Sequence, residues 1–150
     1  MRISTRGEYG LRAMVELALH HGQGPMPLKT VAERQGISEP YLEQLMGTLR
    51  KAGLVNSVRG AQGGYELAVP PERLKVGDIL RVLEGPVVPW ECLDESSGAI
   101  CLFTEACATR GLWKRLQEAI DRVIDSVMLS DLVEEHKQLQ VDGGALLYDI

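Results

Sequence analysis

The stretch ISEPYLEQLMGTLRKAGLVNSVRGAQGGYEL, residues 37–67, decides the fold of this chain. Its first half repeats apolar residues at the spacing of a helix and begins with Ser38, a residue type that favours helix starts. Gly53 ends that pattern. Two short strand-like runs follow, Val55 to Val58 and Tyr65 to Val69, with glycines between them. We therefore predict a helix followed by a β-hairpin.

A shorter helical pattern that contains Val31 and Ala32 precedes this stretch. Gly36 stands between the two patterns, where a tight turn needs a residue that tolerates positive φ. Helix and turn alone would also suit an ordinary helical hairpin, but the added β-hairpin makes the pattern that of a winged helix. A further helix is expected from Ser4 to about His21. The predicted fold class is mainly α with a small β-hairpin wing.

A winged helix presents the first turns of its second helix to the major groove of DNA. Gln44 can form paired hydrogen bonds with adenine, and Glu43 can accept one from cytosine. Arg59 at the hairpin tip is placed to enter the minor groove, although a solvated turn charge is the alternative for this residue. The predicted DNA-binding residues are Ser38, Glu39, Pro40, Tyr41, Glu43, Gln44 and Arg50 in the helix, and Arg59, Gly60, Gln62, Gly63 and Gly64 in the wing.

The charge of the chain is unevenly divided. Its net charge is -5, but residues 1–75 carry 10 Lys and Arg against 7 Asp and Glu, whereas residues 76–150 carry 6 against 14. A positive face is therefore available only in the half that contains the predicted winged helix.

All three cysteines lie between Trp90 and Trp113, at Cys92, Cys101 and Cys107. The sequence shows neither a signal-peptide pattern nor a membrane span, so an odd number of thiols fits a reducing compartment, and we expect a cytoplasmic protein. Such thiols can hold a metal, undergo oxidation or simply be buried. Among the metals that these thiols could hold, zinc is a weak candidate, because structural zinc sites usually show Cys-x2-Cys pairs, which this sequence lacks.

A short amphipathic helix is expected at residues 74–85, before the cysteines, and a long one follows them from Leu112 to Val127. The apolar stripe of the long helix needs a partner, so we expect a homodimer formed by helix pairing. We expect a break near Leu129 and no regular structure after Gln140. The predicted organisation is a winged helix-turn-helix DNA-binding domain at 1–84, a cysteine-containing loop at 85–111, a dimerisation helix at 112–136 and a tail at 137–150.

Together these segments closely resemble the bacterial winged-helix regulators of the IscR, NsrR and CymR family. The matching pieces are MRISTRGEYGLRAM at residues 1–14, the stretch 37–67, and three cysteines before Leu112, Trp113 and a long helix. The resemblance implies a homodimeric transcription factor that binds an approximately two-fold operator in double-stranded DNA.

The resemblance also implies that Cys92, Cys101 and Cys107 hold an iron–sulfur cluster, with [2Fe–2S] favoured and [4Fe–4S] as the alternative. Many members carry a histidine three residues after the last cysteine, where this chain has Arg110, so the fourth ligand is open. Other members have an acidic residue at the position of Glu8 that reaches the partner subunit's cluster. Glu8 is therefore a candidate ligand, or else an acid that favours the start of its helix.

Cluster-free members of the family imply two other functions. The thiols can themselves be oxidised without a metal, or the chain can dock onto an enzyme of sulfur metabolism through its acidic second half. The sequence contains no Walker loop, nucleophile elbow or paired acid and base, so we do not expect an enzyme.

Overall fold

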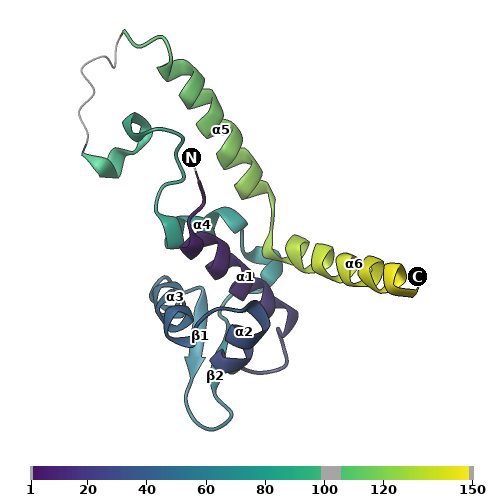
Figure 1. Ribbon diagram of the computed structural model, residues 1–150. Coiled ribbons are helices and arrows are strands. Elements are labelled where there is room, and N and C mark those ends of the chain that lie inside the picture. Colours follow the sequence, from purple (N-terminus) through teal and green to yellow (C-terminus); the bar gives the residue numbers. More distant parts are fainter. Residues whose placement is uncertain (1, 99–105, 149–150) are drawn as a thin grey trace.

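The structure is a computed structural model that describes residues 2–98 and 106–148. Figure 1 shows a body that contains four helices and a β-hairpin, from which two longer helices extend in different directions. The helices of the body are α1 (Thr5–Leu19), α2 (Leu28–Gln35), α3 (Glu39–Lys51) and α4 (Val76–Glu84), and the two longer ones are α5 (Arg110–Ser126) and α6 (Leu129–Tyr148). Short 3-10 turns occupy Pro71–Arg73, Glu91–Leu93 and Glu95–Ser97. No helix in the described ranges is long and apolar enough to cross a membrane.

The predicted helix-turn-helix is confirmed in α2 and α3. Gly36 ends α2 in the left-handed conformation, with φ 64°, and Ile37 is buried in the corner between the two helices. Ser38 is the N-cap residue of α3, but among the described residues its side chain has no capping hydrogen bond. The first helix also matches the prediction, although α1 ends at Leu19, slightly before the expected end.

The wing consists of β1 (Val55–Val58) and β2 (Gly64–Leu67), which pair antiparallel. The second strand begins and ends slightly earlier than the sequence predicts. Gly64 lies at φ 151°, and a Cβ there would meet the Met26 carbonyl oxygen at 2.0 Å. Met26 and Tyr65 exchange two backbone hydrogen bonds of 2.8 and 2.9 Å, so the chain before α2 supports the outer side of the wing.

One hydrophobic core joins the helix-turn-helix, the base of the wing and α4. A fully buried Val, Leu, Ile or Met side chain stabilises a fold by about 1.5–3 kcal/mol. The largest fully buried side chains are those of Met14, Val31, Leu42, Leu45, Met46, Leu49, Val55, Ile79 and Leu129. Because Leu129 is the first residue of α6, that helix is anchored in the core of the winged-helix body.

The C-terminal region differs from the prediction in two respects. The helix break lies at Val127 and Met128, because the Val76 amide donates to the Val127 carbonyl at 2.9 Å and the Leu129 amide donates to the Leu74 carbonyl at 2.8 Å. These two backbone hydrogen bonds keep the link between α5 and α6 extended. The prediction of irregular structure after Gln140 is wrong, because α6 continues to Tyr148. A helix that is anchored at its start can continue through a pair of glycines, each of which costs only about 1 kcal/mol relative to alanine.

Candidate nucleic-acid interface and thiol segment

Helix α3 has a buried face and an exposed one. Leu42, Leu45, Met46 and Leu49 form the buried face. Most of the side chains that the sequence predicts to read DNA lie on the exposed one, namely Ser38, Glu39, Pro40, Glu43, Gln44 and Arg50. The apolar stripe therefore holds the helix on the body, and the polar side chains on the other face are free to enter a groove of DNA.

Tyr41 differs from these neighbours because it is half-buried against α1. Its hydroxyl lies 3.3 Å from Thr5 Oγ1, and its ring meets that of Tyr9 edge-on, with the centroids 6.3 Å apart. These contacts fix α3 relative to the first turns of α1. Tyr41 therefore has a positioning role that the sequence pattern did not reveal.

Arg6, in contrast, is a residue that the sequence analysis did not place at this surface. A hollow of about 150 Å3 lies between the start of α1 and the outer face of α3, and its lining consists of Arg6, Tyr41, Gln44, Leu45 and Thr48. The hollow brings an exposed guanidinium beside the predicted reading residue Gln44. No local pattern around Arg6 signals this, because the proximity arises from packing of α1 on α3.

Glu84, the last residue of α4, holds the start of α1. One of its carboxylate oxygens, Oε1, accepts hydrogen bonds from the Ser4 amide at 3.0 Å, the Gly7 amide at 2.9 Å and the Ser4 hydroxyl. A carboxylate is favourable at this position because helix N-termini carry a partial positive charge. Glu8 lies in the same first turn and is exposed.

The tip of the wing is a glycine-rich turn that exposes Arg59. Gly60 has φ 110°, and the Gly63 amide donates to its carbonyl at 3.0 Å. Gln62 is also exposed, whereas Gly63 and Gly64 are half-buried. Within the hairpin, Arg50 Nη1 of α3 lies 3.4 Å from Ser57 Oγ of β1. A side-chain contact thus joins the two elements that the sequence assigns to DNA binding.

The thiol segment, residues 85–109, runs from the end of α4 to the start of α5. Cys92 and Cys107 are both half-buried and free, while Cys101 lies outside the described residues. In the part of the chain that the structure describes, no three His, Cys, Asp or Glu side chains gather closely enough to hold a metal ion. The described donors therefore do not assemble a cluster site by themselves.

Cys107 lies just before α5, with its Sγ 3.3 Å from Thr109 Oγ1. The hydrogen bond with the Thr109 hydroxyl, the backbone amides of Thr109 and Arg110, and the Arg110 cation together lower the pKa of the Cys107 thiol below its ordinary value. Arg110 replaces the histidine expected from the family resemblance. Its guanidinium cannot ligate iron, but it favours a thiolate at Cys107.

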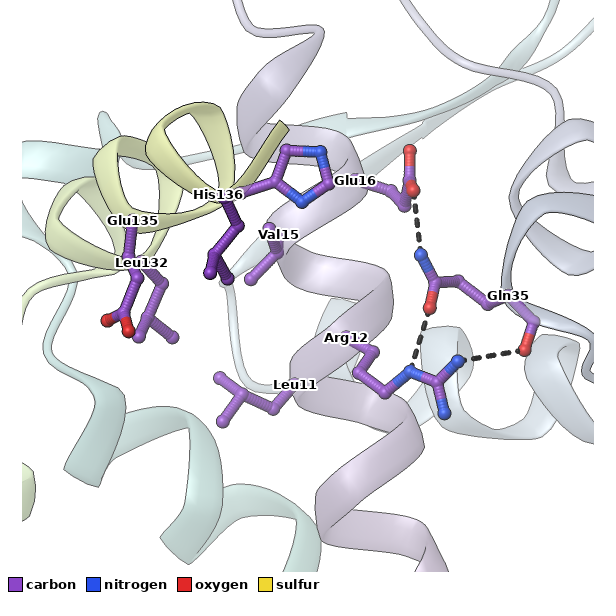
Figure 2. A pocket seen from close by; sticks show the side chains of 9 residues that line it. Leu11, Arg12, Val15, Glu16, Gln35, Leu132, Glu135 and His136 are labelled. Atoms are coloured by element: carbon purple, nitrogen blue, oxygen red, sulfur yellow. Dashed lines mark hydrogen bonds between the residues drawn. The ribbon is translucent and has the colours of Figure 1, made fainter. Parts of the chain in front are cut away.

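A groove of about 480 Å3 separates α1 from α6 (Figure 2), lined by Leu11, Arg12, Val15, Glu16, Gln35, Leu132, Glu135, His136 and Leu139. Glu16 beside it is only 6% exposed, and its carboxylate accepts from Gln35 Nε2 at 2.7 Å and from Arg34 Nη1 at 3.4 Å. Arg12 Nε donates in turn to Gln35 Oε1 at 2.8 Å. This network satisfies the buried charge and fixes α2 on α1.

Comparison with known proteins is consistent with this geometry. Residues 3–135 match the model of the Rrf2 family, which is described as an iron-dependent transcriptional regulator. The chain is 50% identical to the HTH-type transcriptional regulator CymR of Bacillus subtilis over 88% of its own length and 89% of that protein. It is 39% identical to the HTH-type transcriptional regulator IscR of Aliivibrio salmonicida over 94% of its own length and 82% of the relative.

Two solved structures give the same result. The structure of CymR, the global cysteine regulator of B. subtilis, superposes with a TM-score of 0.77 and 48% identity, over 90% of this chain and 98% of that one. IscR of T. potens superposes with a TM-score of 0.76 and 48% identity, over 93% of this chain and 91% of that one. The chain therefore belongs to the Rrf2 family, and it is a winged helix-turn-helix, DNA-binding transcriptional regulator rather than an enzyme.

Proposed function

We propose that the chain acts as a cytoplasmic homodimer that binds operator DNA through α3 and the wing, and that the chemical state of its thiols controls this binding. The observation that carries the proposal is the position of Cys92 and Cys107, two free and partly accessible thiols in the segment that connects α4 to α5. A covalent change in this segment acts on the link between the DNA-binding half and the predicted dimerisation helix.

The signal that fits this arrangement best is the supply or oxidation state of small sulfur compounds. The 50% identity to CymR supports this assignment, because the B. subtilis protein is described as the global cysteine regulator. The lowered pKa of Cys107 is consistent with it, since thiolates rather than thiols attack disulfides and oxidants.

The test compares operator binding of the fully reduced protein with that of protein treated with cystine or hydrogen peroxide. Operators are first selected from random DNA by the reduced protein, and the affinity is then measured by fluorescence anisotropy. We expect the treatment to change the affinity at least tenfold and Cys107→Ser to remove that change. Equal affinities of the reduced and treated wild-type protein would refute thiol control.

A second candidate is control by an iron–sulfur cluster held by Cys92, Cys101 and Cys107. It is favoured by the three cysteines in one segment, by the IscR relatives and by the iron dependence in the family description. Three thiols leave a [2Fe–2S] cluster one protein ligand short, which Glu8 of the partner subunit would supply, whereas a [4Fe–4S] cluster can leave one iron to another ligand. A bound cluster would cross-link the thiol segment in response to iron or oxygen.

Anaerobic purification followed by iron and sulfide analysis separates the two candidates. A brown protein whose visible absorption is lost in Cys92→Ala would establish the cluster. Iron-free protein after anaerobic reconstitution would eliminate it. A pull-down with the metal-free protein tests the remaining prediction, that an enzyme of sulfur metabolism docks onto the acidic second half of the chain.

A further inference from the structure

Arg81 of α4 is bonded to two carboxylates of α5. Its Nη1 and Nη2 donate to the two oxygens of Asp125 at 2.7 and 2.9 Å, and Nη2 also donates to Asp121 Oδ1 at 3.1 Å. Gln117 Nε2 completes the cluster by donating to Asp121 Oδ1 at 3.0 Å and to the Val87 carbonyl at 2.7 Å. We call Arg81, Gln117, Asp121 and Asp125 the Arg81 clamp. It joins α4, the chain just after α4, and α5.

The clamp stands where the apolar contact is small. None of the residues of α5, all of which the structure describes, is fully buried. The apolar part of the joint is a separate small cluster, made by Val76, Leu80 and Val87 with partly buried Ile120, Ile124 and Val127. Apolar contacts are not directional, whereas a two-pronged arginine–carboxylate pair fixes both distance and angle. The clamp therefore adds a directional constraint to the apolar contact between α4 and α5.

Gly77 shows that the local structure leaves room for the clamp. A Cβ at Gly77 would lie 2.1 Å from Asp125 Oδ1 and 2.9 Å from Arg81 Nη1. Gly77 is the second residue of α4, although glycine is a poor helix former. A larger residue at this position would displace the Asp125 carboxylate or the Arg81 guanidinium, and would therefore disturb the clamp.

We propose that the Arg81 clamp is a specificity element that makes the regulator select operators by the distance between their half-sites. The inference rests on the proposed function, in which two copies pair along α5 and each reads one half-site with α3. In such a dimer, the angle between α4 and α5 sets the separation and relative rotation of the two α3 helices. One extra base pair moves a half-site by about 3.4 Å and rotates it by about 35°, so a rigid joint rejects the wrong spacing.

The experiment uses full-length reduced protein and operators with identical half-sites, whose centre-to-centre spacing is varied by one and two base pairs. Wild-type protein should lose at least tenfold in affinity for each base pair away from the best spacing. In Arg81→Met, the ratio between the best and the next spacing should fall to about threefold or less. Affinity for a single half-site should stay within twofold of the wild-type value, because α3 and the wing are unchanged.

Gly77→Ala is the second variant. Its Cβ would disturb the contact between Arg81 and Asp125, while alanine favours helix formation in α4. It should flatten the spacing dependence as Arg81→Met does. Lys137→Met is the matched control, since it removes a cation that lies 3.7 Å from Glu134 on α6, outside the joint. This control should keep the steep wild-type dependence.

The outcomes separate the clamp from the proposed dimer. Steep dependence in wild type, Arg81→Met and Gly77→Ala alike would overturn the role of the clamp and leave the dimer intact. Equal loss on single and paired half-sites in Arg81→Met would also overturn it, because the clamp would then only support the fold. Equal binding of wild type to every spacing would overturn the role of the clamp, and a monomer in sedimentation at the binding concentration would overturn both proposals.

Discussion

Glu84 at the end of α4 accepts a hydrogen bond from the Gly7 amide of α1 at 2.9 Å, and a Cβ at Gly7 would lie only 2.5 Å from the same carboxylate oxygen. Glu84 is followed directly by the thiol segment, whereas Gly7 is close in sequence to Thr5, whose hydroxyl contacts Tyr41 of α3. The end of α4 and helix α3 therefore both contact the first turn of α1.

Removal of this carboxylate should destabilise the protein. Glu84→Ala leaves the amides of Ser4 and Gly7 without their acceptor, so the free energy of unfolding should fall by about 1–3 kcal/mol. Urea denaturation followed by circular dichroism measures the change. Glu118→Ala, at an exposed carboxylate of α5, is the control and should shift the value by less than about 0.5 kcal/mol. A similar small shift for Glu84→Ala would show that water replaces the carboxylate at no cost.

The thiol of Cys107 should titrate below the ordinary cysteine value of about 8.5. Its largest stabilising contact is the hydrogen bond with the Thr109 hydroxyl, so Thr109→Val should raise the pKa of Cys107 and lower its alkylation rate at neutral pH. Iodoacetamide labelling of the metal-free, reduced protein across a pH series, read for Cys107 by mass spectrometry, measures both effects. Thr48→Val removes a hydroxyl that bonds Gln44 on α3 and should leave the Cys107 profile unchanged. An identical profile for Thr109→Val would exclude this hydrogen bond in solution.

Arg59 should contribute to operator binding more than an ordinary surface charge does. Arg59→Ala should weaken binding of the selected operator by about tenfold, the lower part of the range for a side chain that reads DNA, and should reduce discrimination against unrelated DNA. Anisotropy titrations at fixed salt provide the affinity for each DNA. Lys137→Met changes the net charge equally and should have little effect. An unchanged footprint for Arg59→Ala would remove this residue from the reading surface.

The sequence is sufficient for the parts of the fold that depend on local patterns. Gly36 marks the turn, the apolar spacing from Leu42 to Leu49 defines α3, and the glycines near Arg59 mark the wing. The exposed face of α3 follows directly, because polar residues occupy the remaining helical positions. The predicted roles of these residues in DNA binding stay predictions.

The contacts that hold the elements together could not be predicted in the same way. Glu84 meets Gly7, and Arg81 meets Asp125, across long stretches of chain, and nothing near either residue in the sequence identifies its partner. Ser38 and the glycines after Gln140 show the opposite failure. Ser38 favours a capping bond, but its side chain makes none among the described residues. The glycines favour an irregular tail, but α6 continues through them, and its first residue, Leu129, is buried in the core.

The ion pair between Arg81 and Asp125 should make the stability of the α4–α5 joint depend on pH. The hydrogen bonds from Arg81 lower the pKa of Asp125 in the folded protein, so the unfolded chain binds a proton at higher pH than the native one. The contribution is therefore complete above the ordinary aspartate pKa of about 3.9 and is lost as the pH falls through the lower, folded value. The Asp125 side chain is 35% exposed, so solvent screening reduces the contribution.

Comparison with Asp125→Asn, which keeps the shape but does not titrate, isolates this effect. The free energy of unfolding of both proteins is measured in urea at intervals from pH 6 to pH 2.5. The difference between them should be constant above about pH 5 and should shrink below about pH 4, as Asp125 becomes protonated in the wild type. Asp131→Asn is the control, because Asp131 caps the Met128 amide at 2.8 Å outside the clamp. If the wild type and Asp125→Asn lost stability in parallel across the acid range, Asp125 would not be ion-paired in solution.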